Sequence, residues 1–468
     1  MELIDLPVEL LTSVASHLAP GELYRFCQSC RLCWQVAEPL LYHTYRTPEP
    51  PIKFENGHTH RKAPITPFIQ RLIQHPELRV YVRRVELSHW STASNILVDG
   101  YAPQTLSHED FVRYFNTAKE LGLIEQEMSR QVLVRRGWPL YRPKMGFLVS
   151  RDPDEGKPWQ FRWLRQLHAG LEDPQILVMM FLLPRLEEIS IEGNPYEGLP
   201  WRVLELAPHG FPHLRKLTVQ QVHGNFMEYV PLLAAPGMQT FEAWRGDLTR
   251  FTAFNPPAKT SPVTDLFLEY FSLAPKCTLP LLNHFIGLRS FSFSRYHMRP
   301  TDEVEQTQIV QTLLAHKGTL KHLRLEGDYD WDEHHLAFDQ FENLRILAVQ
   351  TSVLRFAEGS PCPLPQSLKV LVLIVNNYLS EFRFEGEGGF IDSYLNRVAP
   401  VVDKLPELEL IEIHVRGPAH SLAVFDDFRV QITRPVVVVR CFERQFGWRG
   451  FIDTFQRFKI LIDEYGEQ

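Results

Sequence analysis

From about residue 180 onward, the chain repeats one spacing of apolar residues: an apolar position, two spacers, a second apolar position, one spacer and a third. Five of the eight intervals between successive matches are 24 or 25 residues, and the others are 28, 32 and 40 residues. Most matches follow a proline or glycine, which favours a turn before them. The alternation within each match predicts a strand with one buried face. The matches begin at Leu186, Leu214, Met238, Val263, Leu288, Leu320, Leu344, Leu368 and Leu408, with a separate earlier match at Val82.

The segments between these strands suit a return path, because residues 174–183, 307–316 and 392–405 have helical spacing. One strand and one helical or irregular return in every ~20–29 residues is similar to a leucine-rich repeat. The asparagine that this family carries three residues after the last core position occurs only at Asn194 and Asn376, so the array is degenerate. The resemblance implies an α/β solenoid at residues 68–434, with parallel strands on its concave face and helices or irregular returns outside.

Residues 89–170 fit the repeat poorly, and we interpret them as an insertion between the first strand and the main array. Apolar spacing predicts two helices inside this insertion, at residues 109–121 and 125–134.

The end of the chain, residues 435–468, predicts a last strand at 436–439 and then an amphipathic helix. The apolar residues of that helix are Phe451, Phe455, Phe458 and Ile462. Because a solenoid needs a cap over its last repeat, we expect this segment to be the cap.

The start of the chain is unusually apolar: 23 of the 40 residues at positions 3–42 are apolar, against 44% in the whole chain. Pro7 suits the first turn of a helix that Pro20 and Gly21 end, and two further short helices follow. Three helices this short cannot bury so much apolar surface among themselves, so the excess must face the rest of the chain or another protein. In the first helix one face carries Val8, Leu11, Ala15 and Leu18, and a second face carries Leu10 and Val14.

This segment resembles an F-box. Residues 6–10 read LPVEL, Trp34 follows 28 residues after Leu6, and residues 37–42 read AEPLLY. The resemblance implies that residues 1–46 form a small all-α module that docks on the Skp adaptor, which bridges F-box proteins to a cullin–RING ubiquitin ligase. It further implies that the adaptor's groove receives Leu6, Pro7, Leu10 and Leu11, and that the same surface is lined or supported by Leu18, Leu23 and Trp34.

Residues 47–67 contain five prolines and show neither helical nor strand periodicity. We therefore expect an extended, semi-stiff connector between the F-box and the repeats.

Three cysteines, Cys27, Cys30 and Cys33, are spaced three residues apart near the start. On a helix, successive thiols of this spacing lie about 300° apart, so only neighbouring pairs point the same way. A structural zinc site needs four ligands, and no fourth ligand lies close in the sequence. We interpret the cysteines as buried core residues and expect neither a metal nor a cofactor.

The residues that alternate with the core positions of each strand line the concave face, where a partner would bind. Those of the early strands are polar, and those of the late strands are apolar. Either the C-terminal segment covers the late apolar face, or that face is a pocket for a partner or small ligand. Because aromatic residues and arginine dominate binding hot spots, exposed side chains here are candidate recognition anchors, although an inserted loop could equally bury them. The candidate substrate-binding residues are Trp244, Phe267, Glu269, His322 and Arg324.

Composition narrows the class of protein. The 49 Lys and Arg against 56 Asp and Glu give a net charge of −7, which argues against a general affinity for nucleic acid or an anionic membrane. The longest apolar run, residues 176–183, is too short to cross a bilayer. The first residues lack a basic segment and the six cysteines lack a disulfide spacing, which indicates an intracellular protein, cytoplasmic or nuclear or both. No P-loop, G-x-S-x-G or H-E-x-x-H motif occurs, so we expect no catalytic residues.

Together these features predict the substrate-recognition adaptor of an SCF-type ubiquitin ligase, which binds the Skp adaptor, and through it the cullin and RING subunits, at one end. The repeats would bind an unknown protein target and speed ubiquitin transfer by proximity alone. The alternative is an F-box scaffold that binds the Skp adaptor without ligase output. A third hypothesis, a hydrolase or transferase within residues 89–170, has no motif in its support.

Overall fold

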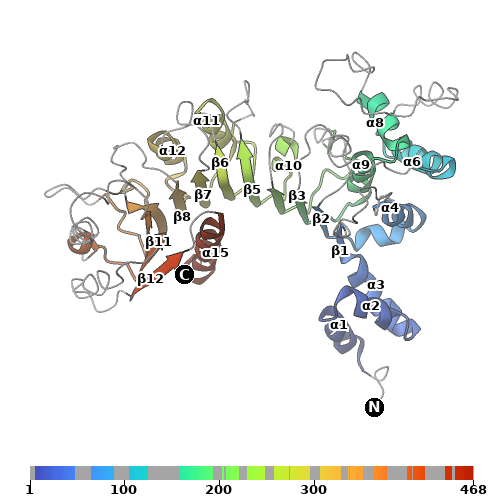
Figure 1. The fold of residues 1–468 in the computed structure, drawn as a ribbon, viewed down its shortest axis with the longest axis horizontal. Coiled ribbons are helices and arrows are strands. Elements are labelled where there is room, and N and C mark those ends of the chain that lie inside the picture. Colours follow the sequence, from blue (N-terminus) through green and yellow to red (C-terminus); the bar gives the residue numbers. More distant parts are fainter. Residues whose placement is uncertain are drawn as a thin grey trace, which may run out of the picture. The chain divides into compact units, whose positions relative to one another are not determined.

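The structure is a computed structural model that describes residues 6–47, 65–88, 105–124, 159–192, 203–204, 207–220, 229–247, 258–272, 275–295, 306–327, 336, 338–351, 354, 363–376, 398–402, 404–416, 438–444 and 448–466. The chain divides into two compact units, Met1–Met238 (unit 1) and Gln239–Gln468 (unit 2). Both units are α/β with parallel strands that follow one another in chain order, as the repeat predicts (Figure 1).

Three helices begin unit 1, as predicted: α1 (Val8–Ser16), α2 (Pro20–Cys27) and α3 (Arg31–His43). Pro7 is the N-cap of α1, and its carbonyl oxygen accepts hydrogen bonds from the backbone N–H groups of Leu10 and Leu11, both at 3.0 Å. At the start of α2, the Glu22 carboxylate accepts a hydrogen bond from the backbone N–H of Ala19 at 3.0 Å, which satisfies a donor that the helix itself leaves open.

The rest of unit 1 combines parallel strands with helices. Its described elements are β1 (Thr44–Arg46), α4 (Ile65–Gln74), η2 (Pro76–Val80), β2 (Arg84–Ser88), α6 (His108–Glu120), α8 (Trp159–His168), α9 (Glu172–Leu182), β3 (Glu188–Glu192), β4 (Lys216–Gln220) and α10 (Val230–Leu233). The strands β1 to β4 pair in register, so Tyr45, Val85, Ile189 and Leu217 form one buried row across the sheet. This row is the unit's core layer.

Unit 2 has the same arrangement over more strands. Its described elements are β5 (Thr240–Asp247), β6 (Asp265–Ser272), α11 (Pro275–His284), β7 (Ser290–Arg295), α12 (Gln306–Leu313), η5 (Leu314–His316), β8 (His322–Glu326), β9 (Ile346–Gln350), β10 (Val370–Asn376), β11 (Leu410–Arg416), β12 (Val438–Arg444) and α15 (Trp448–Tyr465). One buried row of aligned residues runs across it: Phe241, Leu266, Phe291, Leu323, Leu347, Leu371 and Ile411. Figure 1 shows α11 and α12 on one side of this sheet and α15 on the other.

All ten strands that the apolar spacing predicts are confirmed, and each begins two residues after the start of its match. The predicted C-terminal helix is confirmed as α15. A last strand is present too, but β12 covers Val438–Arg444 and so begins inside the predicted range 436–439 and ends five residues after it. The helices predicted at 109–121, 174–183 and 307–316 correspond to α6, α9 and α12 with η5. The helix predicted at 125–134 lies outside the described residues, and of 392–405 the structure describes a helical stretch at 398–402.

The structure corrects the expected boundaries in two places. The last residues of the expected 1–46 module, Thr44–Arg46, form β1, which pairs with β2. The expected connector 47–67 lies largely outside the described residues, but its end belongs to α4, which begins at Ile65. The strand expected within 435–468 pairs with β11 and so continues the sheet of the repeats.

Candidate protein-interaction surfaces

The three N-terminal helices share a small apolar core. Its buried members come from all three helices, because the segment is too short for any one helix to bury its own apolar face. They are Leu11, Ala15, Leu23, Phe26, Cys27, Cys33, Val36 and Ala37, with Leu6 and Leu18 partly buried against them. We call residues 6–43 the N-terminal module.

The module also leaves large apolar side chains in solvent. Of the seven exposed large apolar side chains among the described residues, five lie in this module and only Ile286 and Ile460 lie elsewhere. The five are Val8, Leu10, Val14, Tyr24 and Trp34, which are 37% to 54% exposed. Single exposed apolar residues are common on protein surfaces, but a concentration in one small segment is typical of an interaction surface.

The predicted adaptor-binding residues divide between surface and core. Leu10, Pro7 and Trp34 are exposed, and Leu6 and Leu18 are partly buried. The expectation that Leu11 inserts into a partner's groove is wrong for the free chain, because Leu11 is fully buried in the module's own core, as is most of Leu23. The residues missed were Val8, Val14 and Tyr24, although the second helical face of Leu10 and Val14 already indicated one of them.

This division predicts that alanine substitutions at two adjacent leucines change the stability of the module by very different amounts. Leu11→Ala should lower the free energy of unfolding of the module by about 2–5 kcal/mol, because it empties a buried site. Leu10→Ala should change it by less than about 0.5 kcal/mol, because the side chain is already in solvent. Amide hydrogen exchange in α2 and α3 of the full chain measures both values, and equal effects would contradict the assignment.

The cysteines have structural roles. Cys27 and Cys33 are buried, as predicted, and burial raises the pKa of Cys33 to about 11. Cys30 is instead the N-cap of α3, where its Sγ accepts a hydrogen bond from the backbone N–H of Cys33 at 3.3 Å. Within the described ranges, no group of three or more His, Cys, Asp or Glu side chains is arranged to hold a metal ion.

In unit 1, the sheet face opposite the core row is polar and partly exposed, as the sequence predicts for the early strands. Oppositely charged side chains lie on neighbouring strands: an Arg84 Nη2 lies 2.8 Å from an Oε1 of Glu188, and Arg46 Nε lies 2.5 Å from an Oε2 of Glu86. Such exposed cross-strand pairs contribute little to stability, roughly 0.2–1 kcal/mol each. In the described part of unit 1, the outward side chains of β2, β3 and β4 are partly exposed.

In unit 2 the corresponding face is covered by α15. The sequence left two explanations for the apolar residues that the late strands place on this face, and the structure supports the first: the C-terminal segment covers them. The helix contributes Phe455, Phe458 and Leu461 to a buried cluster on this face. The sheet side of the cluster consists of Phe267, Ile346, Ala348, Val370, Val372, Ile374 and Leu410.

Four of the five candidate substrate-binding residues are consequently buried. Of the two outcomes left open for these side chains, exposure or burial, the structure shows burial, against α15. Phe267, Glu269, His322 and Arg324 are each at most 4% exposed, and Trp244 is partly buried. Phe455 of α15 lies against both aromatic candidates, with ring centroids 4.8 Å from Trp244 and 5.4 Å from Phe267. The structure brings all five together on one face, but beneath the helix.

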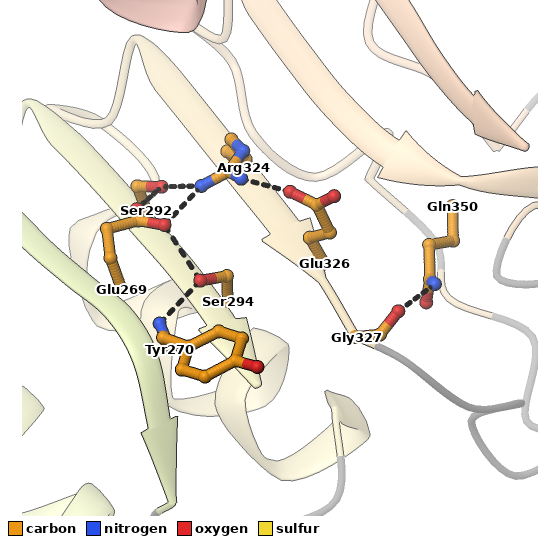
Figure 2. Close-up of polar contacts among 8 residues, drawn as sticks. All are labelled: Glu269, Tyr270, Ser292, Ser294, Arg324, Glu326, Gly327 and Gln350. Carbon is orange, nitrogen blue, oxygen red and sulfur yellow. Dashed lines mark hydrogen bonds and ion pairs between the residues drawn. The ribbon is translucent and has the colours of Figure 1, made fainter. Parts of the chain in front are cut away.

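Under α15, a fully buried arginine joins three strands (Figure 2). Arg324 on β8 donates to an Oε2 of Glu269 on β6 at 2.6 Å and to Ser292 on β7 at 2.9 Å, and it also pairs with Glu326. Ser292 and Ser294 donate to the two carboxylate oxygens of Glu269 at 2.5 and 2.8 Å. Buried charges are tolerated only when they are paired and hydrogen-bonded. The network pairs Arg324 with two carboxylates, but the guanidinium Nε has no hydrogen-bond partner among the described residues.

A second buried polar group lies at three aligned positions of the same strands, β6, β7 and β8. The Ser290 hydroxyl donates to Asp265 at 2.5 Å, and its oxygen lies 2.9 Å from Nδ1 of His322. Because the single hydroxyl proton goes to Asp265, the contact requires Nδ1 to carry the imidazole proton and donate. In the neutral ring Nε2 is then the unprotonated nitrogen, and it has no hydrogen-bond partner among the described residues. Burial lowers the pKa of His322 to about 4, and nearby Arg289 acts in the same direction.

This histidine predicts an acid sensitivity of unit 2. Because the folded pKa of about 4 lies below the unfolded value of 6.5, the neutral ring stabilises the fold above pH 6.5 and this contribution is lost as the pH falls toward 4. The free energy of unfolding should fall by about 2–3 kcal/mol more between pH 7 and pH 4.5 in the wild type than in His322→Asn. Chemical denaturation at the two pH values measures the difference, and parallel losses in both proteins would refute this role.

The comparisons with known proteins assign no family to this chain. A scan against protein-family models and a search of curated proteins both find no match for the chain. Across the described segments, no helix is both long and apolar enough to cross a membrane. The class defined by the described residues is an α/β protein with parallel sheets, an N-terminal helical module with exposed apolar residues, and one sheet face covered by the C-terminal helix.

Proposed function

We propose that the chain is the substrate-recognition adaptor of an SCF-type ubiquitin ligase, in which the N-terminal module is an F-box that binds the Skp adaptor. The observation that carries this proposal is the concentration of exposed apolar side chains on α1, α2 and α3. Burying a fully exposed side chain of this size contributes roughly 1.5–3 kcal/mol. These five are about half exposed, so each offers about half of that, and a partner that covers several of them gains free energy to set against the cost of association.

The remainder of the chain supports the second half of the proposal. Parallel strands that recur at 24 or 25 residues, with helical returns, suit degenerate leucine-rich repeats, as the sequence resemblance implies. The half-exposed polar face of β2, β3 and β4 is the part of the repeats that is open to a protein target. The chain would contribute proximity and would itself make or break no bond.

Reconstitution tests this function. The full chain, mixed with purified Skp adaptor, cullin and RING subunits, should form one complex on size-exclusion chromatography. In cells, a set of proteins should lose ubiquitylation when Leu10 and Val14 are both replaced by aspartate, and Ile286→Asp should leave the same set modified. Absence of cullin from the purified complex would reject the ligase function.

One observation favours the alternative, an F-box scaffold that binds the Skp adaptor without ligase output. The sheet face of unit 2, where a target was expected to bind, is already occupied by α15. The two functions are distinguished by the same experiment: a scaffold would co-purify with the Skp adaptor, but its loss would change no ubiquitylated protein.

A further inference from the structure

The contact between α15 and the sheet of unit 2 combines an apolar centre with charged sides. Phe455, Phe458 and Leu461 lie at intervals of three residues on the helix and are all buried against the sheet. Beside them, Arg457 contacts Glu412 on β11 with an Nη2 to Oε1 distance of 2.5 Å.

The second basic residue of the helix reaches a strand at the other side of the face. Lys459 pairs with Glu242 on β5, and its Nζ lies 4.9 Å from the ring centroid of Phe455 and 5.3 Å from that of Phe267. The two carboxylates, Glu242 and Glu412, are almost completely buried in this state. The helix is therefore recognised by an apolar stripe and by one basic residue at each side of it.

The sheet does not depend on α15 for its backbone hydrogen bonds. The strands from β5 to β12 pair with each other, and the hydrogen bond from Arg345 Nη1 to the Gly466 carbonyl oxygen, at 3.3 Å, reaches only the last residue that the structure describes. The fully buried cation of this face is also paired within the sheet, because Arg324 contacts Glu269 on β6 and Glu326 on β8. Departure of the helix would leave these strand and charge contacts in place.

The charged contacts also argue against a purely permanent cap. Replacing a buried ion pair by well-packed apolar residues is often neutral or stabilising, so ion pairs are a poor choice for stability alone. They give specificity instead, because a helix without basic residues at these two positions would lose the ion pairs with Glu242 and Glu412, while His414, whose Nε2 lies 3.1 Å from Glu412 Oε2, would stay on the sheet. Without α15, the face would be an apolar groove bordered by carboxylates.

We propose that this face is a helix-binding site from which α15 can be displaced by a protein partner. The partner would present an amphipathic helix with an aromatic stripe and two basic residues in the pattern of Phe455, Arg457, Phe458 and Lys459. Identifying this partner as the ubiquitylation target rests on the proposed function, whereas helix exchange does not. Binding of helices in apolar grooves is a common mode of peptide recognition. Because α15 belongs to the same chain, its effective concentration at the groove is high, and a partner helix must bind tightly enough to compete with it.

The test uses the full chain and, as probe, a fluorescent synthetic peptide with the sequence of residues 446–468. In the chain, Arg457→Glu with Lys459→Glu weakens the resident helix and leaves the sheet unchanged. By anisotropy, the peptide should bind this variant at least about tenfold more tightly than it binds the wild-type chain. A peptide with the same two charge reversals should not bind, and Ile460→Asp in the chain, at an exposed position of α15, should behave as wild type.

A second measurement keeps the proposal testable if the variant fails to fold. In the wild-type chain, amide hydrogens of α15 should exchange through local opening, faster than those of β8 and β9. Equal protection of α15 and these strands would overturn the proposal, as would a folded variant that does not bind the peptide. Neither assay contains the Skp adaptor, so a failure here is separate from a failure of the proposed function.

Discussion

If the chain binds the Skp adaptor as proposed, replacing Leu10 and Val14 by aspartate should weaken that binding by more than about 100-fold. The two side chains are four residues apart on α1, so they share one face of the helix, and both are exposed in the free chain. Against the adaptor, each aspartate would place an unpaired charge in an apolar contact, which costs several kcal/mol. Biolayer interferometry with purified adaptor measures the dissociation constant.

A matched control separates this contact from other effects of aspartate. Ile286→Asp replaces an exposed apolar side chain of unit 2, far from the N-terminal module in the sequence, by the same residue. It should bind the adaptor like the wild type. Unchanged binding of the double variant would contradict the proposed surface.

Arg324→Met lowers the free energy of unfolding of unit 2 by about 3–5 kcal/mol, although methionine fills a similar volume. Arg324 is fully buried, and its removal takes away the guanidinium that pairs with both Glu269 and Glu326. Uncompensated buried charges are among the few changes that destabilise a protein this strongly. Chemical denaturation of the full chain, followed by amide exchange in β7 and β8, measures the loss.

The matched control is Lys317→Met. Lys317 also pairs with a glutamate, at 3.2 Å from Glu342, but both side chains are more than half exposed, so its loss should cost less than about 0.5 kcal/mol. Adding Glu326→Gln to Arg324→Met should recover part of the stability by removing one of the two charges. A loss below about 1 kcal/mol in Arg324→Met would show that the network is not required for the fold.

The strands of both units could be predicted from sequence because each carries its own apolar spacing. Leu186, Leu214 and Leu288 precede their strands by two residues and are buried, as the repeat requires. β1 was missed because its three residues are too few to show a period, and only pairing with β2 makes them a strand. Helical phase separated Leu11 from Leu10, but the family resemblance assigned both of them to the same surface.

The site in unit 2 depends on contacts between distant residues, which local patterns do not contain. Glu412 and Arg457 are 45 residues apart, and Glu242 and Lys459 are 217 residues apart. The sequence shows that α15 is amphipathic, but the side chains that cover Trp244 and Phe267 are known only once the helix is placed. The candidates were therefore grouped correctly by strand register, while their exposure depended on a segment far along the chain.

The central claim is that the exposed apolar residues of the N-terminal module are covered by a partner protein. Hydrogen exchange of the full chain, with and without saturating Skp adaptor, tests it most directly. We expect new protection of amides in α1, α2 and α3 and none in β5 to β11. Unchanged exchange throughout α1, α2 and α3 at saturating adaptor would contradict the account.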